Sequence, residues 1–240
     1  MSRELPLVAI DGPAGAGKST ITKSVARELG YIVLDTGALY RSVAWAARRA
    51  NVDWGDENAV ALVAFGLAKR NAISFRSADE GTSSGNQSVW LDGEDISLAI
   101  RTQAMSDGAS RVSSIPLVRD ALLDMQRQVG ETGGVVVEGR DIGSVVFPDA
   151  EAKFFLTASD EVRAQRRFDE LLGRGEGAEL ATVLREVRER DDRDRNRAIA
   201  PLIQAPDAEL VDSSNLTIEQ VVQRMVARVR EIAAKLASST

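Results

Sequence analysis

The sequence predicts an α/β fold in which helices flank a parallel central sheet. Short apolar runs alternate along the chain with longer segments of helical periodicity, the pattern of parallel strands joined by crossover helices. Runs such as Leu7–Ile10 and Val135–Val137 lack the polar alternation of a half-exposed strand, so they indicate strands buried on both faces. A glycine-rich loop at 12–17 separates the first predicted strand from the first predicted helix.

The composition narrows the chemistry that the chain can perform. Its 240 residues include no Cys and no His, which excludes thiol nucleophiles, disulfides, Cys/His zinc sites and Ser-His-Asp triads. Any bound metal must then have oxygen ligands, and this makes Mg²⁺ the first candidate. With 44% apolar residues, the chain is long and apolar enough to bury a substantial core.

Charge and hydropathy argue against a nucleic-acid or membrane partner. The formal net charge is −6 at pH 7, which is unfavourable for binding nucleic acid or an anionic membrane surface. The longest apolar run, 59–68, has about half the length of a membrane span. The run at 5–10 is too short for the apolar core of a signal peptide. We therefore expect a cytoplasmic protein.

The first part of the chain is predicted to alternate strands and helices. Strands are expected at 7–10 and 31–34, and helices at 19–29, 38–50 and 57–69. Gly30 is expected to end the first helix, because glycine readily adopts the left-handed conformation found just after helix C-termini.

The stretch from 72 to 95 differs from its surroundings. Ile73–Phe75 and Val89–Leu91 have the composition of strands, and the long connection at 77–88 is rich in Ser, Gly, Asp and Asn. We expect these two strands to pair in an antiparallel manner. An antiparallel pair within a chain of strand–helix units indicates an inserted subdomain, which we place at 65–102.

The second part of the chain returns to the alternating pattern. Helices are expected at 102–113, 116–129, 159–172, 178–194 and 217–236, and strands at 135–137, 152–156 and 209–211. Pro116 suits the first turn of its helix, and either Ser159 or Asp160 is expected to cap the next one. Apolar residues near 3.6-residue spacing predict one buried face on the closing helix.

The domain prediction is a single domain over 1–240 with a core at about 1–64, 103–157 and 198–240. The helices at 159–172 and 178–194 flank a glycine-containing segment and carry many arginines. We expect residues 158–197 to form a lid together with an Arg-rich helix, because a closing lid excludes water from a group in transfer.

The strongest motif is Gly12-Pro13-Ala14-Gly15-Ala16-Gly17-Lys18-Ser19, which fits the pattern G-x-x-x-x-G-K-[ST] between a strand and a helix. Backbone N–H groups of such a loop surround phosphate oxygens, and the following helix adds the positive end of its dipole. The motif predicts a nucleoside triphosphate ligand. Because an Asn-Lys-x-Asp guanine reader and a Leu-Ser-Gly-Gly-Gln signature are both missing, small-molecule phosphoryl transfer is favoured over GTPase or ABC ATPase activity.

Two further strand ends carry polar side chains. Parallel strands bring their carboxyl ends to one edge of a sheet, where ligands of α/β proteins bind. Asp35, with Thr36 and Arg41 following it, ends the second strand, and Glu138 is followed by Gly139-Arg140-Asp141-Ile142-Gly143. Glu138 and Asp35 compete for the role of the acid that holds a Mg²⁺ water.

The segment Arg185–Arg197 contains six Arg and five acidic residues. Alternating charges on a helix usually form a solvated face with i,i+4 ion pairs. However, Arg190, Asp194 and Arg197 are spaced i, i+4 and i+7 and therefore share one face. Two arginines and one carboxylate on one face suit a phosphate and a sugar hydroxyl.

Four segments, 10–20, 34–41, 138–148 and 190–201, together resemble the bacterial cytidylate kinase family of nucleoside monophosphate kinases. The resemblance covers nearly the whole chain and implies a P-loop NTPase fold with an inserted subdomain on the monophosphate side. It implies Mg²⁺ and ATP as phosphate donor, CMP or dCMP as acceptor, a role in pyrimidine nucleotide metabolism, and a monomer.

The resemblance also implies site residues. ATP is expected to contact Gly12, Pro13, Ala14, Gly15, Ala16, Gly17, Lys18, Ser19 and Thr20, with lid arginines Arg163 and Arg167. CMP is expected to contact Thr36, Arg41, Ser110, Arg119, Arg140, Asp141, Arg190, Asp194 and Arg197. The metal is expected near Ser19, Asp35 and Glu138, and the catalytic charges are expected on Lys18, Arg41, Arg140 and Arg197.

In the cytosine site that the resemblance implies, Asp141 and Ser110 accept from the N4 amino group, and Arg119 donates to N3 or O2. Uracil presents the reverse pattern, so it would leave buried groups unpaired.

Two alternative functions stay open at this point. One is another P-loop kinase of the UMP/CMP, adenylate or shikimate type, and the other is a nucleotide-dependent switch without transfer activity. A panel of acceptors discriminates between them.

Overall fold

The computed structural model describes residues 3–76, 88–173, 175 and 177–238. The chain divides into two compact units, and each is described by itself. The first unit comprises Met1–Leu34 with Val129–Thr240, and the second comprises Asp35–Gln128. The predicted insert at 65–102 lies within the second unit and the predicted lid at 158–197 within the first. The division into core, insert and lid stays a prediction.

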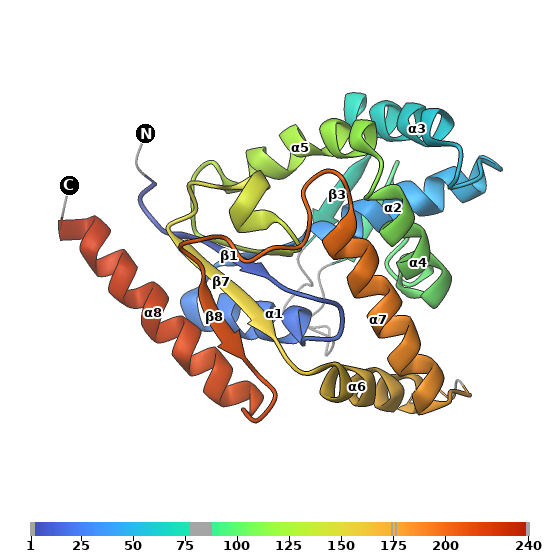
Figure 1. The fold of residues 1–240 in the computed structure, drawn as a ribbon. Coiled ribbons are helices and arrows are strands. Elements are labelled where there is room, and N and C mark those ends of the chain that lie inside the picture. The colour runs from blue at the N-terminus through green and yellow to red at the C-terminus, as the bar shows by residue number, and fades with distance from the viewer. Residues whose placement is uncertain (1–2, 77–87, 174, 176, 239–240) are drawn as a thin grey trace. The chain divides into compact units, whose positions relative to one another are not determined.

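A five-stranded sheet with the strand order β2-β6-β1-β7-β8 organises the first unit (Figure 1). The strands are β1 (Leu7–Asp11), β2 (Ile32–Asp35), β6 (Val135–Gly139), β7 (Ala152–Thr157) and β8 (Glu209–Asp212). The central strand β1 is parallel to both neighbours, with Leu7 opposite Val135 and Val8 opposite Ala152. This arrangement confirms the predicted parallel sheet.

Helices α1 (Lys18–Leu29) and α8 (Ile218–Ser238) pack on this sheet. Val25 of α1 and Met225 and Val229 of α8 are fully buried in the shared core. Gly30 ends α1 at φ 70°, and the N–H of Tyr31 donates to the carbonyl of Ala26 at 2.8 Å. The sequence-based expectation for this helix end is thereby confirmed.

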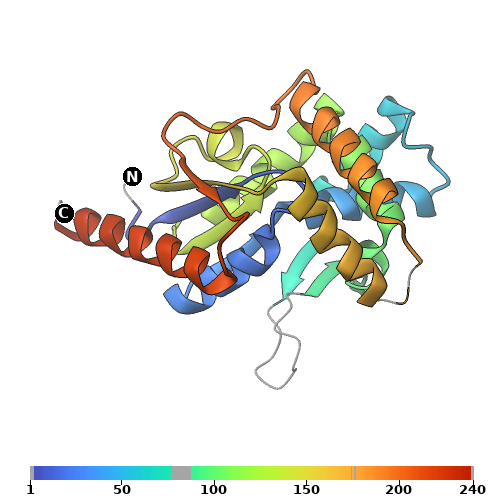
Figure 2. The same cartoon turned by 60° about the horizontal axis from the view of Figure 1, so that its bottom comes forward.

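A helical pair completes the first unit. Helices α6 (Asp160–Gly173) and α7 (Leu180–Asn196) lie side by side in Figures 1 and 2 and share a small core that includes Leu171, Val183 and Val187. Ser159 caps α6, since its hydroxyl accepts from the N–H of Val162 at 3.3 Å. Residues 174 and 176 of the predicted flexible segment lie outside the described residues.

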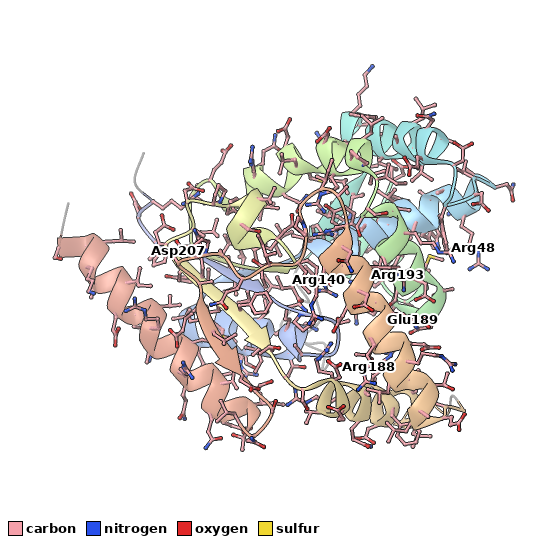
Figure 3. The ribbon with its side chains drawn as sticks, viewed as in Figure 1. Arg48, Arg140, Arg188, Glu189, Arg193 and Asp207 are labelled. Carbon is pink, nitrogen blue, oxygen red and sulfur yellow. The ribbon has the colours of Figure 1, made fainter. Side chains whose placement is uncertain are left out.

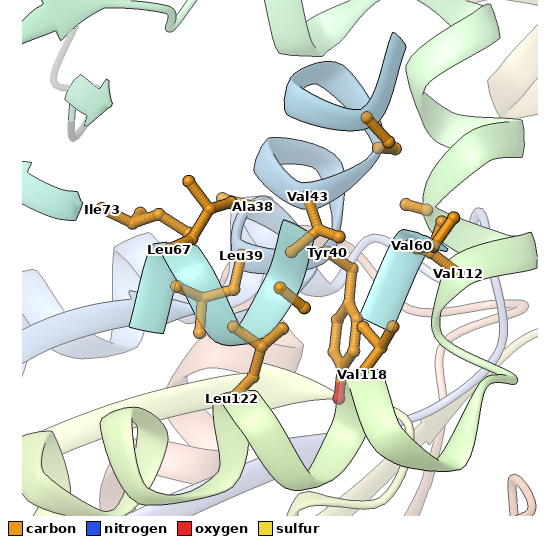
Figure 4. Packing of buried hydrophobic residues seen from close by; sticks show 14 of the residues in the cluster. Ala38, Leu39, Tyr40, Val43, Val60, Leu67, Ile73, Val112, Val118 and Leu122 are labelled. Atoms are coloured by element: carbon orange, nitrogen blue, oxygen red, sulfur yellow. The ribbon is translucent and has the colours of Figure 1, made fainter. Parts of the chain in front are cut away.

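Helices α2 (Thr36–Arg49), α3 (Glu57–Lys69), α4 (Gln103–Val112) and α5 (Pro116–Gly130) build most of the second unit. Their apolar faces meet in one cluster, in which Leu39, Val43, Leu67 and Leu122 are buried (Figure 4). Helix α2 begins two residues earlier than predicted because the Asp35 carboxylate caps it, accepting from the N–H of Ala38 at 3.1 Å.

The second unit also contains the expected antiparallel strands. Strands β3 (Ile73–Arg76), β4 (Ser88–Leu91) and β5 (Glu94–Asp95) form a three-stranded sheet in which Ile73 pairs with Leu91. The predicted connection at 77–88 lies outside the described residues except for Ser88. Strand β5 and the short 3-10 turn Ala99–Arg101 were not predicted, because elements of two or three residues are too short to show a periodic sequence pattern.

All three tryptophans of the chain belong to the second unit. Trp45 stacks under the guanidinium of Arg49, which lies 4.6 Å from the ring centroid. The indole N–H of Trp54 donates to the carbonyl of Ala44 at 2.9 Å, and Trp90 lies in β4. No helix in the described part of the chain has both the length and the apolar character needed to cross a bilayer.

Candidate active site

The glycine-rich loop connects β1 to α1 and folds tightly against the end of β7. A Cβ atom on Gly12 would lie 1.9 Å from the backbone oxygen of Leu156, so only glycine fits at this position. Gly15 and Gly17 have φ values of +74° and +89°, in the left-handed region. The Lys18 ammonium donates to the carbonyl oxygens of Gly12 at 2.8 Å and Pro13 at 2.7 Å.

Two arginines of α6 bind further carbonyls of the same loop. Arg163 donates to the oxygen of Ala14 at 2.8 Å, and Arg166 donates to the oxygen of Ala16 at 3.4 Å. In a planar trans peptide the N–H points away from the C=O. Because cations hold the carbonyls, the N–H groups of the following residues point away from these cations. Such N–H groups suit an anion, as expected for a phosphate-binding loop.

Oxygen donors adjoin the loop at the end of β6. Parallel register places Glu138 opposite Ile10 of β1, and the Ser19 hydroxyl donates to a Glu138 carboxylate oxygen at 2.9 Å. Both groups are hard oxygen ligands of the kind that Mg²⁺ prefers. Within the described ranges no group of three or more acidic side chains converges as a metal site.

Charged side chains from three segments of the first unit cluster at this sheet edge. Arg140 donates to Asp194 of α7 at 2.8 Å, and Figure 3 shows Arg140 beside that helix. Burial lowers the pKa of the Lys18 ammonium well below its usual value, and the charges of Arg140 and Arg190 lower it further, against the opposing effect of Glu138. The cluster therefore favours binding of additional negative charge.

The same positive charges favour the ionised form of Asp194. Burial pushes its pKa up, but the positive charges of Arg140, Arg190 and Arg197 outweigh burial, so the pKa of Asp194 is lowered. Asp194 consequently stays ionised among the arginines and can accept hydrogen bonds from them or from a ligand hydroxyl.

Arg197 and Asp141 form a second buried pair, with 2.9 Å between the guanidinium nitrogen and the carboxylate oxygen. Arg197 also donates to the carbonyl of Ala200. The pair ties the end of α7 to the loop after β6. The two residues were predicted to contact different parts of CMP, Arg197 the phosphate and Asp141 the base, and here they contact each other.

Asp11, at the end of β1, is a residue that the sequence-based prediction missed. Its carboxylate accepts from the N–H groups of Ile142 and Gly143, each at 2.8 Å, and so anchors the π-helical turn Ile142–Val146 directly after Arg140-Asp141. Burial raises the pKa of Asp11 to about 6, although the two backbone hydrogen bonds lower it. A carboxylate that ends an otherwise apolar strand was the available signal.

The α6 arginines divide differently from the prediction. Arg167 pairs with Glu170 on its own helix at 2.7 Å. Arg166, which was not among the predicted ATP contacts, donates to the backbone oxygen of Ser213 at 2.9 Å as well as to Ala16. The Arg163 side chain is only 1% exposed, and this arrangement favours contact with the loop backbone over the predicted contact with ATP.

The second unit holds the remaining predicted residues. Asp35 uses one carboxylate oxygen as the α2 cap and the other to pair with Arg41 at 2.5 Å, which favours Glu138 over Asp35 as the acid near a metal. Thr36 is buried in the first turn of α2. Arg119 lies with its guanidinium carbon 5.7 Å from the Tyr40 ring centroid and donates to the Ser113 carbonyl at 3.4 Å.

Two buried polar atoms of the second unit lack a hydrogen-bond partner among the described residues. These are the Oγ of Ser110 and the Nε of Arg41. A buried polar group without a partner costs free energy, so native structures usually satisfy it with water or a ligand. Both atoms therefore mark positions where a polar ligand is expected.

Each unit brings together part of the predicted site. The first unit gathers Lys18, Ser19, Glu138, Arg140, Asp141, Arg190, Asp194 and Arg197. The second unit carries Asp35, Thr36, Arg41, Ser110 and Arg119. A parallel sheet with a phosphate-binding loop after its first strand, and a cluster of arginines at the same edge, defines a P-loop kinase.

Comparison with known proteins specifies the family. The family profile described as cytidylate kinase matches residues 8–231. A cytidylate kinase from Pelotomaculum thermopropionicum is 47% identical over 224 residues, covering 93% of this chain and 96% of that protein. Another from Pseudomonas entomophila is 48% identical over 225 residues, covering 94% and 96%. The chain belongs to the cytidylate kinase family.

Solved structures of other kinases are more distant. A gluconokinase from Sinorhizobium meliloti 1021 has a TM-score of 0.48 and 14% identity, covering 100% of this chain and 99% of its own. A shikimate kinase from Bacteroides thetaiotaomicron has a TM-score of 0.45 and 15% identity, covering 94% and 98%. Family membership follows from the sequence relatives alone.

Proposed function

We propose that the protein transfers the γ-phosphoryl group of ATP to CMP or dCMP, giving ADP and CDP or dCDP. The observation that carries the proposal is a cluster of charged side chains beside the phosphate-binding loop, in a chain of the cytidylate kinase family. In this cluster Lys18 and Asp194 are buried, and Arg140 and Arg197 are partly buried. Three positive charges next to a nucleotide loop suit a second anionic ligand beside the triphosphate.

ATP binding is assigned to the loop from Gly12 to Thr20. Its N–H groups supply fixed donors. Lys18 and the neighbouring Arg140 and Arg190 lie close enough for the arginines to lower the pKa of Lys18, and a bound anion would offset this repulsion. Ser19 and Glu138 would hold the metal, since their oxygens lie 2.9 Å apart beside the loop. A bound Mg²⁺ neutralises phosphate charge in this class of site.

Nine residues are assigned to the acceptor CMP or dCMP. Arg41, Arg140 and Arg197 are assigned to the CMP phosphate, and Arg190 and Asp194 to the ribose. The base is assigned to Ser110, Arg119 and Asp141, with Thr36 close to the monophosphate. The unpartnered Ser110 Oγ and Arg41 Nε support this assignment, because a nucleotide supplies both the acceptor and the donor that they lack.

The transfer itself needs no dedicated base. A phosphate oxygen of CMP forms a bond to the γ-phosphorus while the bond from that phosphorus to the β,γ-bridging oxygen breaks, and ADP leaves. The attacking oxygen is already ionised, so no proton has to be removed. Catalysis then depends on in-line positioning and on charge stabilisation by Lys18 and the arginines, which suits a chain without His.

The decisive experiment measures ADP release from Mg²⁺ and ATP with CMP, dCMP, UMP, AMP, GMP or shikimate as acceptor. Fast turnover with CMP and dCMP and weak turnover with UMP supports the proposal. Preference for another acceptor contradicts the cytosine assignment, and ATP binding without any acceptor-dependent turnover contradicts kinase activity. Cytoplasmic location, a monomeric state and closure of 158–197 as a lid remain predictions.

A further inference from the structure

Arg163 is the most deeply buried arginine that contacts the phosphate-binding loop, and its guanidinium is bound by protein atoms on every side. Its Nε donates to the Ala158 carbonyl at 3.0 Å and its Nη1 to the Ala14 carbonyl at 2.8 Å. Its Nη2 donates to Asp160 at 2.6 Å and to Asp191 at 2.5 Å. The side chain is 1% exposed, so it has no room for a further ligand.

On the loop side, Arg163 fixes the orientation of one peptide group. The Ala14 carbonyl points at Arg163, so the N–H of Gly15, in the same planar peptide, points the opposite way. The loop also lies directly on α6, since a Cβ on Gly15 would come within 3.2 Å of the Arg163 Cβ. Arg163 therefore holds the loop from its outer side and sets the direction of a phosphate-binding donor.

On the other side, Arg163 fixes the rotation of α7. The Asp191 side chain is 2% exposed and accepts from Arg163. Its neighbour along the helix is Arg190, and Asp194 lies three residues further on, nearly one helical turn away. Asp194 binds Arg140 at 2.8 Å. Anchoring Asp191 thus fixes the helix segment that presents Arg190 and Asp194.

We propose that Arg163 is a positioning residue that, through Asp191, holds the phosphate-binding loop and helix α7 in one arrangement before the nucleotide binds. The proposal rests on the phosphoryl transfer proposed above. A buried ion pair contributes little net stability compared with apolar residues of similar volume, because both charges lose their hydration. Orientation of loop and helix therefore explains this pair better than stability does.

The test is the double variant Arg163→Met/Asp191→Leu, which replaces the pair by apolar side chains. We expect a melting temperature close to that of the unsubstituted protein. We expect kcat with CMP to fall about tenfold to hundredfold, since misplacement of reacting groups by about 1 Å costs this much. We expect the Kd for Mg²⁺ and ATP, measured by calorimetry, to rise by about tenfold, one power of ten being 1.4 kcal/mol.

The matched control is Arg188→Gln. Arg188 joins the same two helices through Asp160 at 3.1 Å and Glu161 at 3.0 Å, but it is exposed and its ion pairs involve no residue of the loop (Figure 3). Exposed pairs contribute little to stability, so this variant should keep kcat and the Kd for ATP within about twofold.

A folded double variant with unchanged kcat and unchanged ATP affinity overturns the proposal, as does a loss of activity that only follows the unfolded fraction in a circular dichroism melt. If the double variant does not fold, Arg163→Lys replaces it. Its single ammonium retains charge but cannot reach all four acceptors, so kcat should fall while the melting temperature is kept; unchanged kcat overturns the proposal. If the unsubstituted protein fails to phosphorylate CMP, the proposed function is wrong, and the ATP affinities still test the positioning role.

Discussion

At the scale of single residues, the site is defined by atoms whose surroundings are unusual for a folded interior. Lys18 is buried among arginines, Asp11 is a buried carboxylate held by two backbone N–H groups and influenced by Lys18, and Ser110 has a buried hydroxyl without a described partner. Each costs free energy when it is buried, and perturbed groups of this kind concentrate where ligands bind.

Substitution Lys18→Ala should lower kcat by about 10²–10³, because it removes a preorganised positive charge from the transferring phosphoryl group. Steady-state turnover with saturating CMP and ATP measures this. The exposed Lys69→Ala variant serves as control and should leave kcat unchanged. Turnover near the unsubstituted value in Lys18→Ala would contradict the role of Lys18.

Substitution Ser110→Ala should separate recognition from stability. The hydroxyl has no partner among the described residues, so its removal should leave the free energy of unfolding unchanged or raise it by about 1 kcal/mol. The KM for CMP should rise, and the preference for CMP over UMP should fall by about tenfold. Retained discrimination would show that the base is read elsewhere.

The raised pKa of Asp11 predicts a pH dependence of stability. A carboxyl whose pKa is about 6 when folded and 3.8 when unfolded binds its proton more tightly in the folded state. The contribution of this carboxyl to the free energy of unfolding then decreases as the pH rises from about 4 to about 6, by at most about 3 kcal/mol. Urea unfolding across this range measures the free energy of unfolding of the unsubstituted protein minus that of Asp11→Asn. This signed difference should fall with rising pH, and a constant value contradicts the assignment.

At the scale of elements, the junction between β1, its loop and β7 leaves no space for a side chain. Gly12→Ala would place a Cβ 1.9 Å from the Leu156 oxygen, so we expect a loss of several kcal/mol, about 3 or more, and a lower thermal midpoint. The matched control is Gly173→Ala at the end of α6, where no atom lies within 4 Å of the new Cβ. That variant should be neutral or up to about 1 kcal/mol more stable.

The predictability of the elements follows from their length and periodicity. The parallel strands and all the long helices were predicted because apolar runs and 3.6-residue spacing identify them without tertiary information. The π-helical turn Ile142–Val146 was missed because it depends on Asp11, a residue 131 positions away from Ile142 in the sequence. A contact between residues so far apart in the sequence produces no pattern in the sequence around either residue.

The same limit applies to the site. The phosphate-binding loop could be recognised from its motif, but the choice among Arg163, Arg166 and Arg167 could not. All three lie on one helix within five residues, and only the packing of α6 on the loop decides that Arg163 and Arg166 reach its carbonyls. The role of Asp191 was likewise hidden in a run of alternating charges.

At the scale of the whole molecule, an acidic chain with a net charge of −6 brings Lys18, Arg140, Arg190 and Arg197 together at one sheet edge. Ligand binding there should stabilise the fold by mass action. Mg²⁺ and ATP at about a hundred times their Kd should raise the free energy of unfolding by about 2.7 kcal/mol. Chelation with EDTA should reduce this shift and abolish turnover. An ATP effect that survives chelation would contradict a metal-dependent site.

The location of the tryptophans gives the two units different optical properties. Since Trp45, Trp54 and Trp90 all belong to the second unit, the tryptophan emission of the protein originates there, and the unit that carries the phosphate-binding loop contributes none. A titration followed by tryptophan fluorescence therefore reports on the second unit without any added label. Quenching or a wavelength shift reports events around helices α2 and α4 and strand β4, and an emission-detected melting curve follows this half of the chain while circular dichroism follows both.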